Sequence, residues 1–498
     1  MTLNPSALVF TAAAMILCTP PAWAGPQTTE QAADIDAFVR RAMTTVQTVP
    51  GLSLAVVDGE EIVIVSGYGV ADVEARRPVD ADTAFYIASA TKSFTALAIA
   101  AMDHRGEVNL DLPLASWTQS TAFPAEQAAS VTLTDLLSHR SGLANDAMAY
   151  RAAFSGDHTP TIMQGLLAET TLNVDAPRGT FQYTNVGYNL ATTLLETRFG
   201  RDWRALVREE VLSPAGMNHT TGWISHARAD GVLATGHLVF AAEGPVASPL
   251  QKVDQTMQSA GGLVSTANDM ARWLELQIND GLLDGRQVFP AGLVASTHSS
   301  RVAQDRAFGA YRRDGYGLGW QVGRYGEDVL IHHFGNFSGS RAHASFMPGR
   351  RLGVVVMVNE DLVTGELADL VANYVYDRFA GRADLEVTYD ALLAEMVTTR
   401  DRRVAGLARA RAERAARPSM LSRPIEAYLG TYVNPAMGTI DITQVDGRLV
   451  VRLGVMSAVA EAFTQAESIR VELVPFQGQV ITFGPDSLTV DQQVFTRQ

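Results

Sequence analysis

The chain reads YIASATKSF at residues 86–94, and this stretch decides how the rest of the sequence is interpreted. Lys92 follows Ser89 by three residues, an S-x-x-K spacing that places both side chains on one face of a helix. Lys92 and Lys252 are the only lysines among 39 basic residues. Arginine stays protonated, whereas a buried lysine can lose its proton and act as a base. The stretch predicts a serine activated by an amine, and the alternative is a capping serine beside an exposed lysine.

The residues that follow Lys92 are almost all apolar. The run FTALAIAAM at 94–102 is hydrophobic on nearly every side, and Gly106 ends it. Such a helix is buried, and it is too short to span a bilayer, which takes about 20 apolar residues. We therefore expect Ser89 and Lys92 in the first turn of a central core helix, where the helix dipole lowers the pKa of the lysine.

Two weaker motifs follow in chain order. Tyr183 and Asn185 form a Y-x-N, and His333 and Gly335 form an H-x-G that opens a strand-like run. Each alone is most often structural, a tyrosine beside a turn or the end of a strand. All three motifs in this order, with a long segment between the first and the third, rarely arise by chance.

With these motifs the chain resembles the serine β-lactamase and penicillin-binding protein superfamily. The resemblance is to the branch that contains class C β-lactamases, D-alanyl-D-alanine carboxypeptidases and β-lactamase-like esterases. Connecting phrases at residues 133–143, 213–217 and 259–270 support it. The resemblance implies an α+β fold, with a β-lactamase/transpeptidase-like antiparallel sheet flanked by helices and a helical middle third inserted into it.

The resemblance also implies a role for each motif residue. Ser89 is the acylated nucleophile, Lys92 its proton partner and Tyr183 the general base of this branch. Asn185 contacts the lysine and the substrate amide. The oxyanion hole consists of the backbone N–H groups of Ser89 and of Asn336, which follows the third motif. Donors of this kind contribute about 3 kcal/mol each.

The chemistry of Tyr183 depends on Lys92. A phenol with a pKa near 10 acts as a base at neutral pH only if a nearby ammonium stabilises its phenolate. The two groups therefore titrate as a coupled pair. The sequence leaves open which of them takes the first proton.

The third motif departs from the Lys-Thr-Gly of class C β-lactamases. Here it reads His333-Phe334-Gly335, without the cation and the hydroxyl that help to bind a substrate carboxylate. We expect His333 and Gly335 to contact the substrate and β-lactam hydrolysis to be inefficient. Arg341 lies close by in sequence and is a candidate for the missing cation, with a merely solvated strand arginine as the alternative.

The N-terminus predicts export. Residues 1–24 carry no charged side chain, contain an apolar stretch and end in the A-x-A pattern of a cleavage site. We interpret them as a signal peptide that leaves no transmembrane anchor after cleavage, and we expect a secreted or periplasmic bacterial protein. A retained anchor is the alternative, but the apolar stretch is short for one.

Composition excludes several classes of function. The formal net charge of −14 argues against nucleic acid as a partner. The ten histidines show no paired spacing and the only cysteine is Cys18, so we expect no metal and no cofactor. A small molecule or a cell-wall peptide is the expected substrate.

The chain divides into four expected segments. The signal peptide precedes a hydrolase domain at 25–385, whose alternating stretch at 52–67 predicts a hairpin that pairs with late strands near 343–358. An arginine- and alanine-rich helical linker, expected to be solvated, covers 386–420. Short alternating runs spaced by turns make 421–498 a small all-β domain, in which no residue is expected to be catalytic.

The sequence therefore favours an exported serine hydrolase that forms an acyl-enzyme. The scissile bond is an amide or an ester, in a D-amino-acid peptide, a β-lactam or a simple ester. The alternative is a penicillin-binding or sensor protein that keeps the scaffold without turnover.

Overall fold

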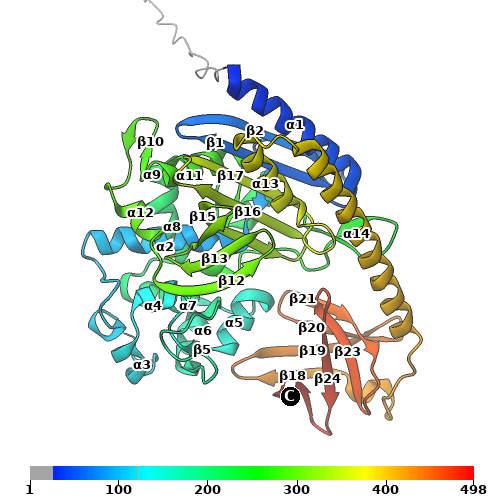
Figure 1. The fold of residues 1–498 in the computed structure, drawn as a ribbon. Coiled ribbons are helices and arrows are strands. Elements are labelled where there is room, and N and C mark those ends of the chain that lie inside the picture. Colours follow the sequence, from blue (N-terminus) through cyan, green and yellow to red (C-terminus); the bar gives the residue numbers. More distant parts are fainter. Residues whose placement is uncertain (1–25, 119) are drawn as a thin grey trace, which may run out of the picture.

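The structure is a computed structural model that describes residues 26–118 and 120–498, so the predicted signal peptide lies outside the described residues. Its centre is a nine-stranded antiparallel sheet of order β12-β13-β14-β15-β16-β17-β1-β2-β3 (Figure 1). The strands are β1 (Gly51–Asp58), β2 (Glu61–Asp72), β3 (Arg77–Pro78), β12 (Val302–Phe308), β13 (Tyr311–Tyr316), β14 (Gln321–Tyr325), β15 (Asp328–Phe337), β16 (Ser340–Met347) and β17 (Leu352–Val358).

Strands from the two ends of the hydrolase domain meet in the middle of this sheet. β1 and β2 form the predicted hairpin, and β1 pairs with β17 from Leu52 opposite Val358 to Asp58 opposite Leu352. Both central strands are buried along nearly their whole length. A strand that is covered on both faces needs apolar residues at every position, and this explains the continuous valine-rich run of β17.

Helices cover both faces of the sheet (Figure 1). One face packs against α1 (Pro26–Val46) and α13 (Leu367–Phe379), and the other against α11 (Ala267–Ile278), with α2 (Thr91–His104) beyond it. All but the last two residues of α2 are buried, and Phe94 stacks on Trp273 with ring centroids 3.7 Å apart. The predicted central core helix is confirmed.

Most of the remaining elements of the middle segment are short, and α7 is the longest of them. The helices are α3 (Ala125–Ser130), α4 (Leu133–Leu137), α5 (Asp146–Tyr150), α6 (Pro160–Leu166), α7 (Val186–Phe199), α8 (Trp203–Val207), α9 (Ser213–Ala215), α10 (Ile224–Ala229) and α12 (Leu293–Thr297). The two-stranded pairs are β4 (Phe85–Tyr86) with β9 (Val264–Ser265), β5 (Leu143–Ala144) with β6 (Thr171–Leu172), β7 (His237–Val239) with β8 (Pro245–Ala247), and β10 (Leu282–Leu283) with β11 (Arg286–Gln287).

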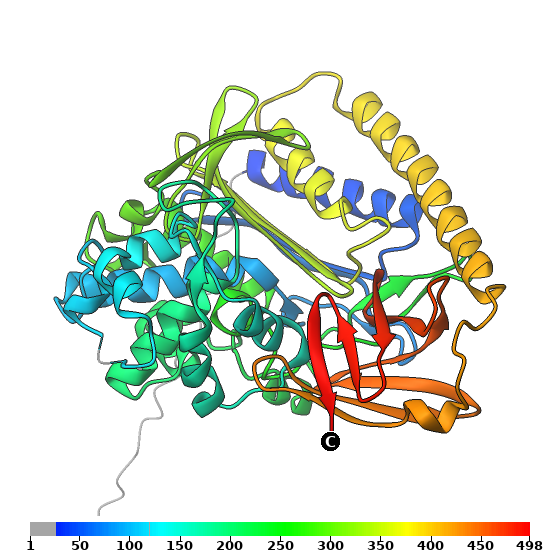
Figure 2. The same cartoon turned by 90° about the horizontal axis from the view of Figure 1, so that it is seen from below.

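The C-terminal part begins with a long helix, α14 (Leu385–Ala415), and continues as a nearly closed all-β domain (Figure 2). Its nine antiparallel strands have the order β21-β20-β19-β18-β26-β25-β24-β23-β22. They are β18 (Gly430–Asn434), β19 (Gly438–Val445), β20 (Arg448–Leu453), β21 (Met456–Val459), β22 (Glu461–Ala462), β23 (Ser468–Val474), β24 (Gln477–Phe483), β25 (Ser487–Val490) and β26 (Gln493–Arg497). The predicted fold class is confirmed in both parts.

The C-terminal domain is docked on the hydrolase domain by polar and apolar contacts. The Arg151 guanidinium donates to the carbonyl of Ala436 at 3.0 Å, and Val455 N donates to the carbonyl of Ser155 at 2.8 Å. α14 is also attached, because Arg400 donates to the carbonyl of Val46 at 2.7 Å. Figure 2 shows α14 running along the outside of the molecule between the two parts. At least part of this arginine-rich helix is bound to the protein, whereas the sequence predicted a solvated one.

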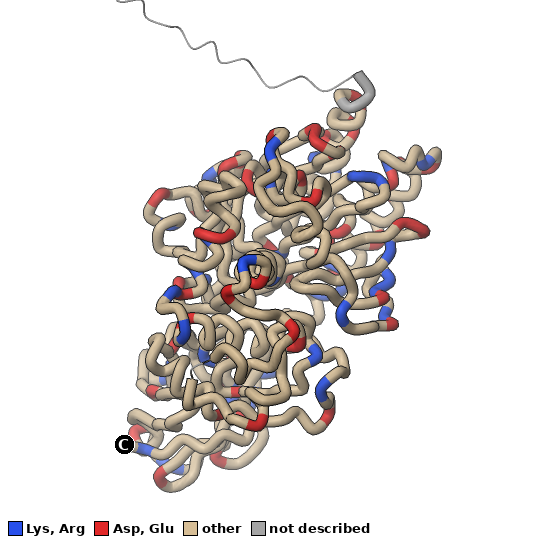
Figure 3. The backbone as a smooth tube through the Cα atoms, turned by 90° about the vertical axis from the view of Figure 1, so that its left-hand side faces the viewer, with Lys and Arg blue, Asp and Glu red and all other residues tan. Residues whose placement is uncertain are grey.

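Basic and acidic positions are interspersed along the chain on the side shown in Figure 3. Within residues 26–118 and 120–498, no helix is both long and apolar enough to cross a membrane. The same residues contain no group of three or more histidine, cysteine, aspartate or glutamate side chains placed to hold a metal ion.

Candidate active site

Ser89 and Lys92 lie together at the start of α2. Ser89 belongs to a 3₁₀ turn, Ala88–Ala90, and α2 itself begins at Thr91, so the serine precedes the first α-helical turn in which it was expected. Lys92 Nζ lies 3.1 Å from Ser89 Oγ. The alternative of an exposed lysine is excluded, because Lys92 has no exposed surface.

The Lys92 amine has two further partners, and both are oxygen atoms that can only accept. Nζ lies 2.8 Å from Asn185 Oδ1 and 2.7 Å from the carbonyl oxygen of Ala260. No carboxylate pairs with this amine among the described residues. Burial without a counter-charge lowers the pKa of Lys92 well below its usual value.

Both acceptors are held in place by neighbouring elements. Asn185 is the N-cap residue of α7. The Ala260 carbonyl follows Ser259, whose hydroxyl contacts Thr192 Oγ1 at 2.8 Å and Asn189 Oδ1 at 3.1 Å. The Y-x-N asparagine and a loop between α10 and α11 therefore fix the lysine from two sides.

Tyr183 completes the group around Ser89. Its ring centroid lies 4.9 Å from Lys92 Nζ. The residue is 41% exposed and lines the cleft. Desolvation of the hydroxyl raises the pKa of Tyr183, and the neighbouring Ser89 hydroxyl offsets only part of this rise.

An aromatic cage behind Tyr183 was not predicted from the sequence. The His139 ring lies 4.4 Å from that of Tyr183 and 4.6 Å from that of Tyr316. His139 adopts a φ of 59°, unusual for a residue with a side chain, and its Nδ1 accepts from Thr184 N at 3.3 Å. A backbone conformation of this kind has no signal in the sequence, although the phrase that contains His139 lies within the connecting segments that support the resemblance.

His333 joins the same cage from β15. Its Nε2 lies 3.0 Å from Tyr316 Oη and its Nδ1 lies 2.9 Å from the carbonyl oxygen of Phe334. Burial lowers the pKa of His333 well below its usual value, so the ring is neutral. The carbonyl can only accept, so Nδ1 carries the proton and Nε2 accepts from Tyr316.

The edge of β15 faces the turn that carries Ser89. β14 pairs with β15 only as far as His332, so residues 333–337 are unpaired on that side of the strand. A Cβ atom added to Gly335 would lie 2.0 Å from the carbonyl oxygen of Ile87, in the turn that carries Ser89. The third motif needs glycine here because the strand and the nucleophile turn touch through their backbones.

The arginines near the cleft differ in whether a carboxylate of the protein neutralises their charge. The Arg341 guanidinium is paired with Asp369, which also contacts His343 Nδ1 at 2.9 Å. Arg313 has no carboxylate partner in the described part of the chain, and its guanidinium lies 3.9 Å from the ring centroid of Phe308. Arg341 remains a predicted substrate contact, but Arg313 is the less neutralised cation.

Several of these groups line one cleft of about 700 Å³ that includes Ser89. From the hydrolase domain it also contains Tyr183, Asn185, His333 and the β12–β13 hairpin with Arg306 and Arg313. The C-terminal domain contributes the turn between β23 and β24, residues 474–477, where Phe476 stacks on Phe240 with ring centroids 5.0 Å apart. No pattern in the sequence predicted that this domain would reach the site.

Comparison with known proteins agrees with this geometry. The family model described as Beta-lactamase matches residues 35–376. The chain belongs to the Beta-lactamase family. Unguisins hydrolase ungD of Aspergillus violaceofuscus is 26% identical over 435 residues, which cover 80% of this chain and 75% of that protein. Penicillin-binding protein 4 of Amycolatopsis lactamdurans is 27% identical, over 66% of this chain and 86% of its own.

The fold of this Beta-lactamase family member is also found among solved structures. The octameric penicillin-binding protein homologue of Pyrococcus abyssi superposes with a TM-score of 0.58 at 20% identity. The match covers 93% of this chain and 99% of that one, and so includes the C-terminal domain. At this identity the likeness concerns the fold alone.

Proposed function

We propose that this Beta-lactamase family member is a serine hydrolase that cleaves amide or ester bonds through an acyl-enzyme on Ser89. The observation that carries the proposal is the contact of the Ser89 hydroxyl with a buried amine that has no counter-charge. A scaffold that no longer undergoes acylation has no need to bury such an amine against a serine.

Lys92 is the first proton acceptor in this proposal. A neutral amine has two hydrogens and one lone pair. Two of its three neighbours, Asn185 Oδ1 and the carbonyl oxygen of Ala260, can only accept and therefore take the two hydrogens. The lone pair is left for the hydroxyl of Ser89. The lowered pKa of Lys92 keeps this neutral form populated.

Tyr183 then serves the leaving group. As Ser89 Oγ bonds to the carbonyl carbon, its proton passes to Lys92 and the carbonyl oxygen becomes an oxyanion, which the backbone N–H groups of Ser89 and Asn336 stabilise. The bond to the leaving group breaks as that group takes the proton of the Tyr183 hydroxyl, and the phenolate that remains takes the proton that Lys92 received from Ser89. Tyr183 is suited to donate because its raised pKa keeps it protonated.

The order of these proton transfers has a direct test. Tyr183→Phe should slow hydrolysis of a p-nitroanilide much more than that of a p-nitrophenyl ester, since an anilide needs a proton on its leaving nitrogen and p-nitrophenolate needs none. Lys92→Arg should abolish both, because a guanidinium does not give up its proton. If Tyr183→Phe slowed both substrates equally, Tyr183 and not Lys92 would be the base.

Three further parts of the proposal concern context. Residues 1–24 act as a signal peptide, so that the mature enzyme is secreted or periplasmic. The hydrolase domain of residues 25–385 and the β domain of residues 421–498 are separate units joined by the helix between them. The substrate is a small molecule or a cell-wall peptide.

A further inference from the structure

The loop that joins β17 to α13 presents a carboxylate to the cleft. Glu360 begins this loop and is fully buried, with Oε1 accepting from Leu362 N and Val363 N at 2.8 Å each. Its Oε2 accepts from Thr364 N at 2.8 Å. The backbone of the loop is closed around one carboxylate, which fixes where the next residue, Asp361, points.

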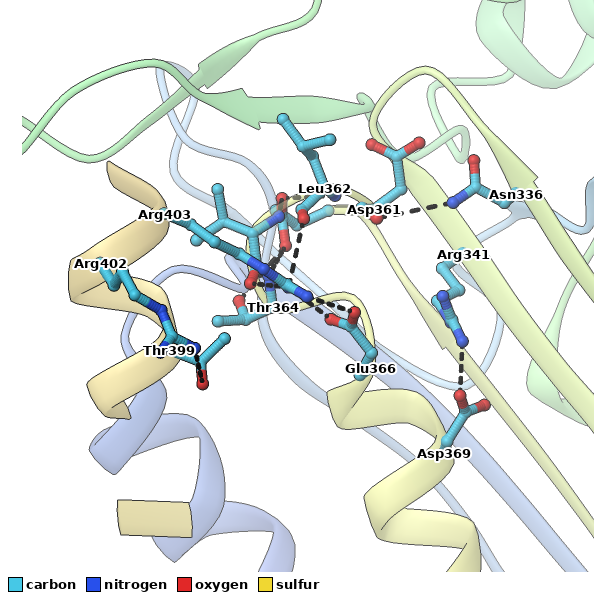
Figure 4. Close-up of polar contacts among 12 residues, drawn as sticks. Asn336, Arg341, Asp361, Leu362, Thr364, Glu366, Asp369, Thr399, Arg402 and Arg403 are labelled. Carbon is cyan, nitrogen blue, oxygen red and sulfur yellow. Dashed lines mark hydrogen bonds and ion pairs between the residues drawn. The ribbon is translucent and has the colours of Figure 1, made fainter. Parts of the chain in front are cut away.

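α14 holds the same loop from outside. Arg403 donates to the carbonyl oxygen of Val363 at 2.8 Å and forms two bonds, of 3.1 and 3.0 Å, with the Glu366 carboxylate (Figure 4). A bidentate arginine contact fixes geometry as well as charge. The loop is therefore held on its inner side by Glu360 and on its outer side by the arginine-rich helix.

Asp361 and Leu362 of this loop line the cleft that contains Ser89. Asp361 Oδ1 accepts from Gly339 N at 2.9 Å, and its backbone carbonyl accepts from the Asn336 side chain at 3.5 Å. Asp361 Oδ2 has no partner in the described part of the chain. Figure 4 shows Asp361 and Asn336 close together, across the loop from Arg403.

Asp361 forms no ion pair in the described part of the chain. Two arginines that Figure 4 shows beside its loop are paired with other carboxylates, Arg341 with Asp369 and Arg403 with Glu366. Burial in the cleft, reinforced by the charge of Glu360 and partly offset by that of Arg341, raises the pKa of Asp361 to about 7. An aspartate held rigidly in a binding cleft without an ion-pair partner is suited to receive a cation from a ligand.

We propose that Asp361 binds an ammonium group on the acyl portion of the substrate, and this rests on the proposed acyl-transfer function. The position of Asp361 along the unpaired edge of β15 indicates that it contacts the acyl portion and not the leaving group. Tyr183, which protonates the leaving group, lies by His333 with ring centroids 6.1 Å apart, whereas Asp361 lies by Asn336. Three residues of a strand separate the two places by about 10 Å. The preferred substrates are aminoacyl amides or esters with a free amine.

The test compares two anilides that differ only in the amine. They are phenylalanine p-nitroanilide, tested as each enantiomer, and 3-phenylpropionyl p-nitroanilide. The wild type should have the higher kcat/KM for at least one aminoacyl enantiomer. Asp361→Asn should lower this preference by about 10- to 100-fold, which is the effect of one charge-assisted hydrogen bond. The kcat/KM for the substrate without an amine should stay within about twofold of the wild-type value.

Two variants separate this contact from general effects. Asp305→Asn removes an equal charge from an aspartate of the β12–β13 hairpin that is 82% exposed and paired with Arg312, and it should leave the preference unchanged. Arg403→Met releases the loop from α14. It should reduce the preference by raising KM for the aminoacyl anilide, whereas a loss of fold would lower kcat/KM for both substrates together.

The outcomes are distinct. Asp361 does not bind an ammonium group if the wild type shows no preference for either aminoacyl enantiomer. The same conclusion follows if Asp361→Asn lowers kcat/KM equally for the substrates with and without an amine. If neither anilide is turned over, the same pair is compared as competitive inhibitors of p-nitrophenyl butyrate hydrolysis, with the same expected difference. Absence of any hydrolysis and of fluorophosphonate labelling at Ser89 would instead refute the proposed function itself.

Discussion

Gly335→Ala should disable the active site without unfolding the protein. The added Cβ would lie 2.0 Å from the carbonyl oxygen of Ile87, whereas a carbon and an oxygen in contact are separated by at least about 3.3 Å. β15 and the turn that carries Ser89 must therefore move apart by about 1.3 Å. The Ile87 oxygen belongs to the backbone, and the backbone of residue 335 sets the place of the added Cβ. No side-chain rotation can therefore relieve the clash. The two proposed oxyanion donors, on Ser89 and Asn336, separate with them.

A displacement of about 1 Å at a reacting centre costs about 100-fold in rate. We expect kcat/KM for p-nitrophenyl butyrate and the rate of fluorophosphonate labelling to fall by at least this factor, with the circular dichroism spectrum retained. Gly349→Ala is the matched control, because Gly349 has no atom within 4 Å of the added Cβ and no positive φ. Labelling of Gly335→Ala at the wild-type rate would show that this backbone contact does not position the nucleophile.

Four further outcomes are expected. Ser89→Ala should remove all hydrolysis and all labelling with an unchanged Tm, and labelling that persists would place the nucleophile elsewhere. The labelling rate of the wild type should rise with pH to a plateau well below pH 10.5, as the lowered pKa of Lys92 requires, and a rise that continues past pH 10 would contradict it. The wild type should cleave p-nitrophenyl butyrate readily and nitrocefin about 10- to 100-fold less efficiently, because the third motif lacks a cation and a hydroxyl. The double variant His333→Lys, Phe334→Thr should shift the ratio of the two kcat/KM values toward nitrocefin. Faster wild-type cleavage of nitrocefin than of the ester would refute this account of the third motif. Ending the chain after Arg417 should leave a folded hydrolase domain that is labelled at Ser89. Its preference for ester chain length, measured as kcat/KM across p-nitrophenyl esters, should change because the β23–β24 turn no longer lines the cleft. An unreactive truncation would show that the C-terminal domain is required for the site.

Local signals were enough to predict the fold and the group around the nucleophile. The apolar helix after Lys92 had to be buried because it has no polar face, and the spacing of Ser89 and Lys92 brings their side chains together in any helical turn. The hairpin near residue 58 and the continuous apolar run of β17 specify strands in the middle of a sheet for the same kind of reason. Patterns of period 2 and period 3.6 are properties of the sequence itself.

The surroundings of that group depended on contacts between distant segments. His139 reaches Tyr183 through a backbone conformation without a sequence signal, and Arg341, next to the third motif in sequence, is paired with Asp369 from α13. Neither contact has a spacing rule, because the loops that create them are not periodic.

The sequence by itself determined the pairing of Ser89 with Lys92 and the sheet that carries the third motif, because each depends on neighbours within a few residues or on a regular hydrophobic period. Tertiary structure alone decided which charges remain available in the cleft and what closes it. Asp361 has no ion pair because Arg341 is bound to Asp369 and Arg403 to Glu366. The β23–β24 turn reaches the cleft because the C-terminal domain docks beside α5. A charge is neutralised by whatever side chain folding brings within a few ångströms, and this cannot be read from its position in the chain.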